Sequence, residues 1–346
     1  MQWRIRERLT RQHKPEASVH GVQRSRSSSA STGCAASEGT CGSAPSSGDS
    51  SRKTPLSTSQ DYPTDTDWQQ LLPLEHETRI PLCWRTPRST TAHFFCTDSA
   101  EKFREHQRSG STLRYSEHDI LYSFNAQGYR TDEFEASSDK FRALALGCSL
   151  TQGVGLPKSE TWSHLVCQQL ATVRGHEVAD LNLGSAGACN EGIIIRGMHV
   201  VRALKPRLVL VQYTFPLRKL HVRQGGDVRE WARPQCDVSD EPPDYAAYFR
   251  DVQTQEDDLV QIALLINLFS GYLNSMNVPH VNVLCFQRRD TLRYLASRIP
   301  SDNSVLQYVR GGAPARDMLH PGREVHERVA QLATERAVAV LRDGPP

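Results

Sequence analysis

The 346-residue chain lacks several features that mark large classes of proteins. It has no apolar run approaching the roughly 18 residues that a membrane-spanning helix needs, so we expect no membrane span. It has no strong excess of charge, because 41 Lys and Arg residues are balanced by 39 Asp and Glu residues, for a formal net charge of +2. This balance does not favour nucleic acid as a partner.

Phosphate-binding and metal-binding patterns are missing as well. The Gly-rich stretch "GCSLTQGVG" at residues 147–155 has neither the Gly-Lys-Ser/Thr ending of a P-loop nor the GxGxxG spacing of a dinucleotide site. The nine cysteines form no CxxC pair. The sequence therefore predicts reduced thiols, a cytoplasmic location, no metal and no cofactor.

Residues 1–60 have little that could build a hydrophobic core. They are rich in Ser, Arg, Gly and Thr, as in "RSRSSSASTG". Such a stretch buries too little apolar surface to offset the entropy lost on ordering, so we predict a disordered N-terminal extension. Its Arg and Ser content also fits an organellar transit peptide, whereas a secretory signal would need a continuous apolar core.

The rest of the chain has strand and helix patterns. Residues 61–135 contain aromatic clusters such as "TAHFFCT" between polar turns and predict an accessory segment of short strands and loops, packed on the main domain. Residues 136–346 alternate apolar strands with helix-period segments, which predicts a three-layer α/β/α sandwich with a central, mainly parallel sheet of the flavodoxin-like kind. The expected strands are 141–147, 178–184, 207–213 and 280–286, and the expected helices are 159–173 with Ser159 as N-cap, 190–204, 257–276 and 323–341.

Reactive side chains follow these strands, where open α/β sheets bind their ligands. Ser149 follows the first strand at a sharp turn, which exposes a side-chain oxygen beside backbone N–H groups that can stabilise an oxyanion. Asp317 and His320 stand three residues apart in "DMLHPG", just before the last helix. The three residue types fit the roles of nucleophile, orienting carboxylate and base. The same pattern also fits Asp317 as a turn residue and His320 as a surface imidazole.

Three blocks in this order resemble the SGNH (GDSL-type) hydrolases, a family of esterases, lipases and sugar-ester deacetylases. They are "GCSLTQG", "NLGSAGACN" and "DMLHPG", and the resemblance covers about residues 124–342, including "FNAQGYRTDEF". It implies Ser149 as nucleophile, Asp317 and His320 as its partners, and an oxyanion hole formed by the backbone N–H groups of Ser149 and Gly187.

Two departures from the family pattern concern the same site. Cys148 replaces the Asp of the GDS block, and Thr214-Phe215-Pro216 stands where the third block should read G-x-N-D. The Asn that adds a side-chain donor to the oxyanion hole is therefore missing, a loss that can cost roughly a hundredfold in rate. Asn190, Gln212 or Thr214 could substitute for it. We favour Asn190 as the substitute donor. A role as the N-cap of the helix that follows fits this residue at least as well.

The insertion at residues 216–244 carries several cations and one tryptophan. It is either a lid whose cations, including Arg218, and Trp231 receive an acidic or sugar-bearing substrate, or a solvated loop. Thr214, just before the insertion, is a further candidate for substrate binding. The resemblance of the three blocks implies a serine esterase. Together with this insertion, it suggests a small-molecule acyl ester or an acylated carbohydrate as the substrate.

Three alternatives remain open at the level of the sequence. An O-acyltransferase would use the same residues. Cys148 with His320 would make a thiol nucleophile. A binding protein with the same fold could be weakly catalytic or inactive, because a fold does not imply a function.

Overall fold

The computed structural model describes residues 88–134, 140–222, 228–232 and 253–343. By its contacts the chain divides into Met1–Gln60 and Asp61–Pro346, and every described residue belongs to the second unit. The predicted N-terminal extension, residues 1–60, lies outside the described residues. In the described part of the chain, no helix combines the length and the apolar composition of a membrane-spanning segment.

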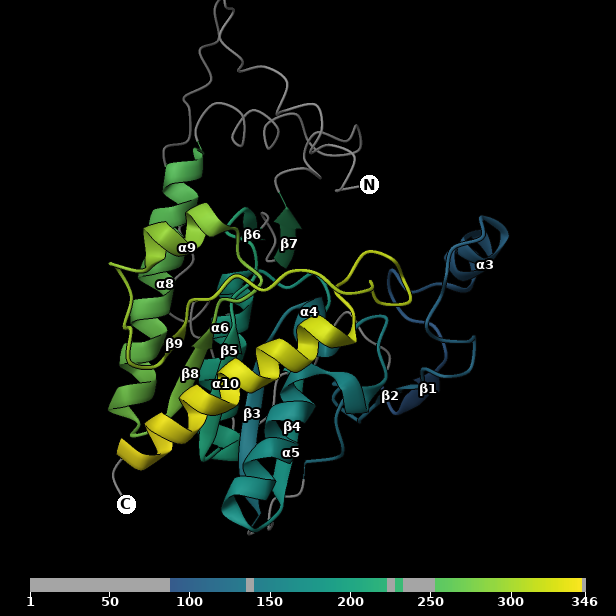
Figure 1. The fold of residues 1–346 in the computed structure, drawn as a ribbon. Coiled ribbons are helices and arrows are strands. Elements are labelled where there is room, and N and C mark those ends of the chain that lie inside the picture. Colours follow the sequence, from purple (N-terminus) through teal and green to yellow (C-terminus); the bar gives the residue numbers. More distant parts are fainter. Residues whose placement is uncertain (1–87, 135–139, 223–227, 233–252, 344–346) are drawn as a thin grey trace, which may run out of the picture. The chain divides into compact units, whose positions relative to one another are not determined.

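A five-stranded parallel sheet forms the centre of the unit (Figure 1). Its strand order is β4-β3-β5-β8-β9, the 2-1-3-4-5 order of flavodoxin-like doubly wound sheets. The register pairs Leu144 of β3 with Leu181 of β4 on one side and with Val209 of β5 on the other. The strands are β3 (Phe141–Gly147), β4 (Val178–Gly184), β5 (Leu208–Gln212), β8 (His280–Val283) and β9 (Ser304–Val305).

Helices cover both faces of this sheet because successive strand residues point to opposite sides. Leu144 and Val209 belong to a core that includes α6 (Asn190–Leu204) and α8 (Gln255–Ser275). Ala143 and Leu208 belong to a second core with α5 (Trp162–Arg174) and α10 (Arg323–Asp343), which Figure 1 shows on the near side of the sheet. The predicted three-layer α/β/α sandwich is confirmed.

Most element boundaries lie within two residues of the prediction. Strand β8 ends at Val283, three residues before the predicted end, and the starts of two helices differ for local reasons. The prediction of Ser159 as N-cap is wrong: Lys158–Glu160 forms a single 3₁₀ turn, and α5 begins after Thr161. There the backbone N–H of Trp162 donates to Nδ1 of His326 at 3.0 Å. Helix α8 begins earlier than predicted because Thr254 and Asp257 form a reciprocal capping box.

The segment of residues 88–134 contains more regular structure than the sequence predicted. An antiparallel pair joins β1 (Thr90–Ala92) to β2 (Tyr122–Phe124), and between them lies the unpredicted helix α3 (Ala100–Arg108). Ser99 begins α3 by accepting a hydrogen bond from the N–H of Lys102. A small core joins aromatic and aliphatic residues of the segment to Leu156 and Ala315, which belong to the sandwich part of the chain.

The insertion after β5 forms a two-stranded antiparallel hairpin in its described part. Strand β6 (Arg218–Val222) pairs with β7 (Val228–Ala232), and Lys219 stands opposite Trp231 in the register. The side chain of Trp231 lies outside the described part, so its predicted contact with substrate stays a prediction. The remaining described helices are α4 (Ser149–Gln152) and α9 (Arg289–Leu295).

Candidate active site

The turn that carries Ser149 joins β3 directly to the short helix α4. Cys148 has an extended backbone, with φ −98° and ψ −154°, and α4 ends at Gly153 in the left-handed region at φ 73°. The end of β4 packs so closely on this helix that a Cβ on Gly184 would lie 2.3 Å from the backbone nitrogen of Gln152. Only glycine fits there, and the turn that carries Ser149 is thereby held against the sheet.

A continuous chain of hydrogen bonds joins Ser149, His320 and Asp317. Nε2 of His320 lies 2.8 Å from Oγ of Ser149, and Nδ1 of His320 lies 2.6 Å from Oδ2 of Asp317. The side chain of Asp317 is 0% exposed and that of His320 is 16% exposed. The structure thus brings together the three residues that the sequence assigned to one site, at the carboxyl end of the sheet.

The two oxygens of the Asp317 carboxylate have different partners. Oδ1 accepts hydrogen bonds from the backbone N–H groups of Leu319 and His320, at 3.1 and 3.0 Å. This arrangement closes a tight loop in which Met318 adopts a left-handed backbone with φ 56°. Oδ2 faces the imidazole and also accepts a hydrogen bond from Oγ1 of Thr97 at 2.6 Å.

These contacts keep the Asp317 carboxyl ionised. Burial by itself would raise its pKa, but the hydrogen bond and charge of His320, followed by the hydrogen bond from Thr97, lower the pKa of Asp317 to about 2. An ionised carboxylate can only accept hydrogen bonds, so Nδ1 of His320 carries the hydrogen. Nε2 is then the acceptor for the Ser149 hydroxyl, the arrangement that a general base requires.

The low pKa of Asp317 predicts a pH-dependent stability. Its folded value of about 2 lies below the ordinary value of 3.8, so the carboxylate stabilises the fold above about pH 4 and stops doing so as the pH falls towards 2. We expect the loss of unfolding free energy in Asp317→Asn, measured by urea titration, to be larger at pH 5 than at pH 3. Asp290→Asn, at an exposed carboxyl, is the matched control. An equal loss at both pH values would contradict the prediction.

Two backbone N–H groups are available for an oxyanion. Ser149 is the first residue of α4, and Gly187 lies in the turn after β4 with a left-handed φ of 78°. Neither N–H has an intramolecular acceptor among the described contacts. Both groups are therefore without an acceptor within the described part of the chain, and their pairing in an oxyanion hole stays a prediction.

Asn190 is held by the backbone that follows β5. Its Oδ1 accepts from the N–H of Thr214 at 2.8 Å, and its Nδ2 donates to the carbonyl of Thr214 at 3.2 Å. The N-cap of α6 is Cys189, whose sulfur accepts from the N–H of Gly192, so the N-cap role considered for Asn190 is wrong. One Nδ2 hydrogen of Asn190 has no acceptor among the described contacts.

The other two candidates for the missing donor have different partners. Gln212 accepts through Oε1 from Thr151 and from the backbone N–H of Cys148, and its Nε2 donates to the carbonyl of Tyr213 at 2.6 Å. Thr214 is 1% exposed, and its hydroxyl accepts from the guanidinium of Arg218 at 3.2 Å. Gln212 therefore supports the nucleophile turn, while Arg218 and Thr214 form a polar pair beside it.

Cys148, the alternative nucleophile, has a different environment from Ser149. Its thiol is buried and lies 3.3 Å from Oε1 of Gln212, whereas the imidazole of His320 contacts Ser149. The geometry favours the hydroxyl over the thiol. Within the described residues, no group of three or more His, Cys, Asp and Glu side chains is arranged to hold a metal ion.

Comparisons with known proteins give matches in structure only. No protein-family model matches the chain, and no curated protein matches its sequence significantly. Matching solved structures include a protein from Desulfitobacterium hafniense grouped with the lipolytic G-D-S-L family, at 14% identity, TM-score 0.35, and coverage of 57% of this chain and 99% of that one.

Two further matches are described as esterases. The esterase EstA from Pseudoalteromonas sp. matches at 12% identity and TM-score 0.37, covering 59% of this chain and 100% of that one. A family 3 carbohydrate esterase from Clostridium thermocellum matches at 11% identity and TM-score 0.37, with 59% and 98% covered.

Several residues that support the site were missed by the sequence analysis. Thr97 contacts Asp317, and Arg316 forms a buried ion pair with Asp98. The guanidinium of Arg130 donates to the carbonyls of Gln152, Gly153 and Leu156 at the end of the nucleophile helix. Arg130 lies within "FNAQGYRTDEF", which is part of the region that resembles the SGNH hydrolases, but nothing in that stretch indicates a role for its arginine.

Proposed function

We propose that this protein is a serine esterase that cleaves a carboxylic ester through Ser149, His320 and Asp317. The observation that carries the proposal is the unbroken chain of contacts from the Ser149 hydroxyl through the His320 imidazole to the ionised Asp317 carboxylate. A nucleophile, a base and an orienting group within hydrogen-bond reach are the requirements of acyl transfer through a serine.

The first half of the reaction forms an acyl-enzyme. Oγ of Ser149 attacks the ester carbonyl carbon while its proton passes to Nε2 of His320. Asp317 holds the Nδ1 hydrogen and stabilises the imidazolium that forms. The negative oxygen of the tetrahedral intermediate is stabilised by the backbone N–H groups of Ser149 and Gly187. The ester C–O bond then breaks, and the imidazolium gives its proton to the leaving alkoxide.

The second half releases the acid. Nε2 of His320 takes a proton from a water molecule that attacks the acyl carbon, and the same proton returns to Oγ of Ser149 as the acyl-enzyme breaks down. An acceptor hydroxyl in place of water would transfer the acyl group through the same residues. A small acyl ester or an acylated carbohydrate is the substrate class that we propose.

The role of third oxyanion donor is proposed for Asn190. Both backbone groups of Thr214 fix the plane of its amide, and one Nδ2 hydrogen is left over. A donor held in this way loses little entropy when a negative oxygen forms beside it. Arg218 and Thr214, next to this amide, are proposed to contact the polar part of the substrate.

A covalent probe tests the proposed function directly. We expect a fluorophosphonate to label the native protein and mass spectrometry of its peptides to place the adduct on Ser149. We also expect the rate of p-nitrophenyl acetate hydrolysis to fall in proportion to the fraction of protein labelled. A protein that neither takes up the probe nor turns over the ester would instead be a binding protein, which the missing third-block asparagine would permit.

A further inference from the structure

A tight turn at residues 95–98 reaches the site from outside the sandwich. Phe95 and Asp98 exchange two backbone hydrogen bonds, of 2.8 and 3.1 Å, and between them Cys96 adopts a left-handed backbone with φ 59°. The turn is fixed at both ends, with β1 before it and α3 after it. It can therefore present the side chains of Thr97 and Asp98 in defined directions.

Consecutive residues of this turn contact consecutive residues of the loop that carries the candidate triad. Thr97 donates its hydroxyl to Oδ2 of Asp317 at 2.6 Å. Asp98 forms a bidentate pair with Arg316, whose Nε lies 2.9 Å from Oδ1 and whose terminal nitrogen lies 2.8 Å from Oδ2. The side chains of this pair are 1% and 0% exposed, so both contacts exclude water.

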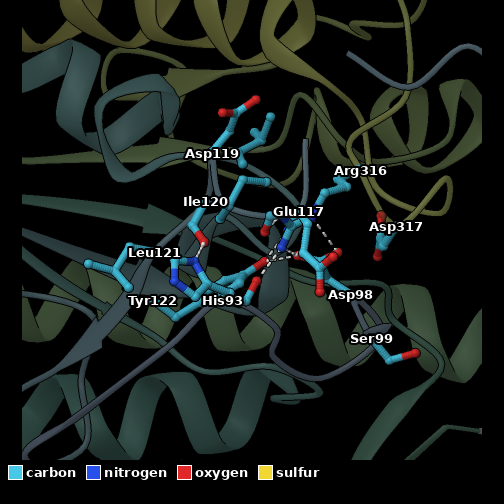
Figure 2. A network of polar contacts seen from close by, with 12 residues as sticks. His93, Asp98, Ser99, Glu117, Asp119, Ile120, Leu121, Tyr122, Arg316 and Asp317 are labelled. Carbon is cyan, nitrogen blue, oxygen red and sulfur yellow. Dashed lines mark hydrogen bonds and ion pairs between the residues drawn. The ribbon is translucent and has the colours of Figure 1, made fainter. Parts of the chain in front are cut away.

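The same aspartate also connects the turn to the nucleophile side of the site. Tyr122 donates to Oδ2 of Asp98 at 2.6 Å and accepts from the N–H of Gly155 at 2.7 Å, just beyond the nucleophile helix. The N–H of Arg316 in turn donates to the carbonyl of Gly155 at 3.0 Å. Figure 2 shows His93, Asp98 and Tyr122 gathered around the Arg316 side chain, with Asp317 beside it on the same loop.

We propose that Thr97 is a positioning residue of the active site, which holds the Asp317 carboxylate in line with His320 by donating to the oxygen that receives the imidazole N–H. The inference rests on the proposed esterase function and adds to it a part of the chain outside the three sequence blocks. Residues 88–134 then contribute a hydrogen bond to the active site in addition to hydrophobic packing.

The geometry explains why this hydroxyl matters for the reaction. Oδ1 of Asp317 is occupied by the backbone of its own loop, so among the described contacts Oδ2 has two partners, the Thr97 hydroxyl and the His320 imidazole. Because the Asp317 side chain is 0% exposed, water does not replace a lost donor. A misdirected carboxylate holds the imidazole less well while it becomes charged in the transition state, so the loss falls on kcat more than on KM.

Thr97→Val and Thr97→Ser separate the hydroxyl from the shape of the side chain. A hydrogen bond to a charged group is worth enough to predict a fall of about 10- to 100-fold in kcat for Thr97→Val, with KM changed less than about twofold. Thr97→Ser restores the donor and is expected to keep kcat within about threefold of the native value. Thr91→Val, at an exposed threonine of β1, is the matched control and should leave kcat unchanged.

A second readout does not depend on activity. The hydrogen between Nδ1 of His320 and Asp317 should give a low-field proton NMR signal, which we expect to shift or broaden in Thr97→Val and to return in Thr97→Ser. Equal losses in the valine and serine variants, or a lower melting temperature with native kcat and an unchanged signal, would overturn the proposal. A native protein inert to probe and ester would refute the esterase function instead, and the NMR signal would still decide whether Thr97 positions Asp317.

Discussion

Ser149→Ala is expected to lower kcat for an ester substrate by about 10⁴-fold or more and to abolish labelling by the fluorophosphonate. Members of a catalytic triad act as a unit, so removing the nucleophile alone removes most of the acceleration that the three residues supply together. The substitution deletes one buried hydroxyl and leaves the contact between His320 and Asp317 in place. Circular dichroism and the melting temperature should therefore remain close to those of the native protein.

Cys148→Ser is the control for this experiment, because it changes the neighbouring nucleophile in the same turn. The Cys148 thiol contacts Gln212, so a hydroxyl there can keep that contact and most of the activity. Loss of labelling in Cys148→Ser together with retention in Ser149→Ala would replace the serine mechanism by a thiol mechanism. Retained labelling in both variants would place the reactive group elsewhere in the protein.

Arg316→Met is expected to lower the free energy of unfolding by about 3–5 kcal/mol, the usual result of leaving one partner of a buried ion pair alone. Arg316 is 1% exposed, and besides Asp98 it donates to the backbone carbonyls of Ser116, Glu117 and His93. The buried Asp98 carboxylate would lose its charged partner, and the partly buried carbonyls would lose a donor. Urea unfolding followed by circular dichroism measures the change.

Two further variants show whether the buried charge is the cause. In the double variant Arg316→Met with Asp98→Leu, part of the stability should return because no carboxylate remains buried alone. Arg293→Met removes an arginine from a pair with Asp290 whose side chains are 80% and 66% exposed, and it should leave the unfolding midpoint unchanged. A double variant less stable than Arg316→Met would contradict the explanation.

The sandwich could be predicted from the sequence because it rests on local patterns, and the grouping of Ser149, Asp317 and His320 because three local blocks resemble one family. Apolar runs at 141–147 and 178–184 read directly as β3 and β4. The turn after β3 and the DxxH spacing place reactive groups at the end of the sheet where parallel strands present them. The DxxH spacing alone also fits a turn residue and a surface imidazole, and the resemblance of the three blocks to the SGNH hydrolases is what predicts one shared site.

The supporting residues were not accessible in this way. Thr97 is a half-buried threonine in a turn that depends on the left-handed backbone of Cys96. Glycine or asparagine at that position would have indicated such a turn, but cysteine does not. Arg316 and Arg130 look like surface cations until their partners are known, because arginine is seldom buried without a fixed set of acceptors. Their roles depend on chain segments that are brought together only by the tertiary fold.

The separation of these contacts along the chain has a consequence for how activity appears during folding. Thr97 and Asp317 are 220 positions apart, and Ser149 and His320 are 171 positions apart. Contacts of such long range close large loops, and they form late relative to helices and hairpins. The proposed esterase activity would therefore report completion of the whole folding reaction, whereas the helical signal would report only the early, local part.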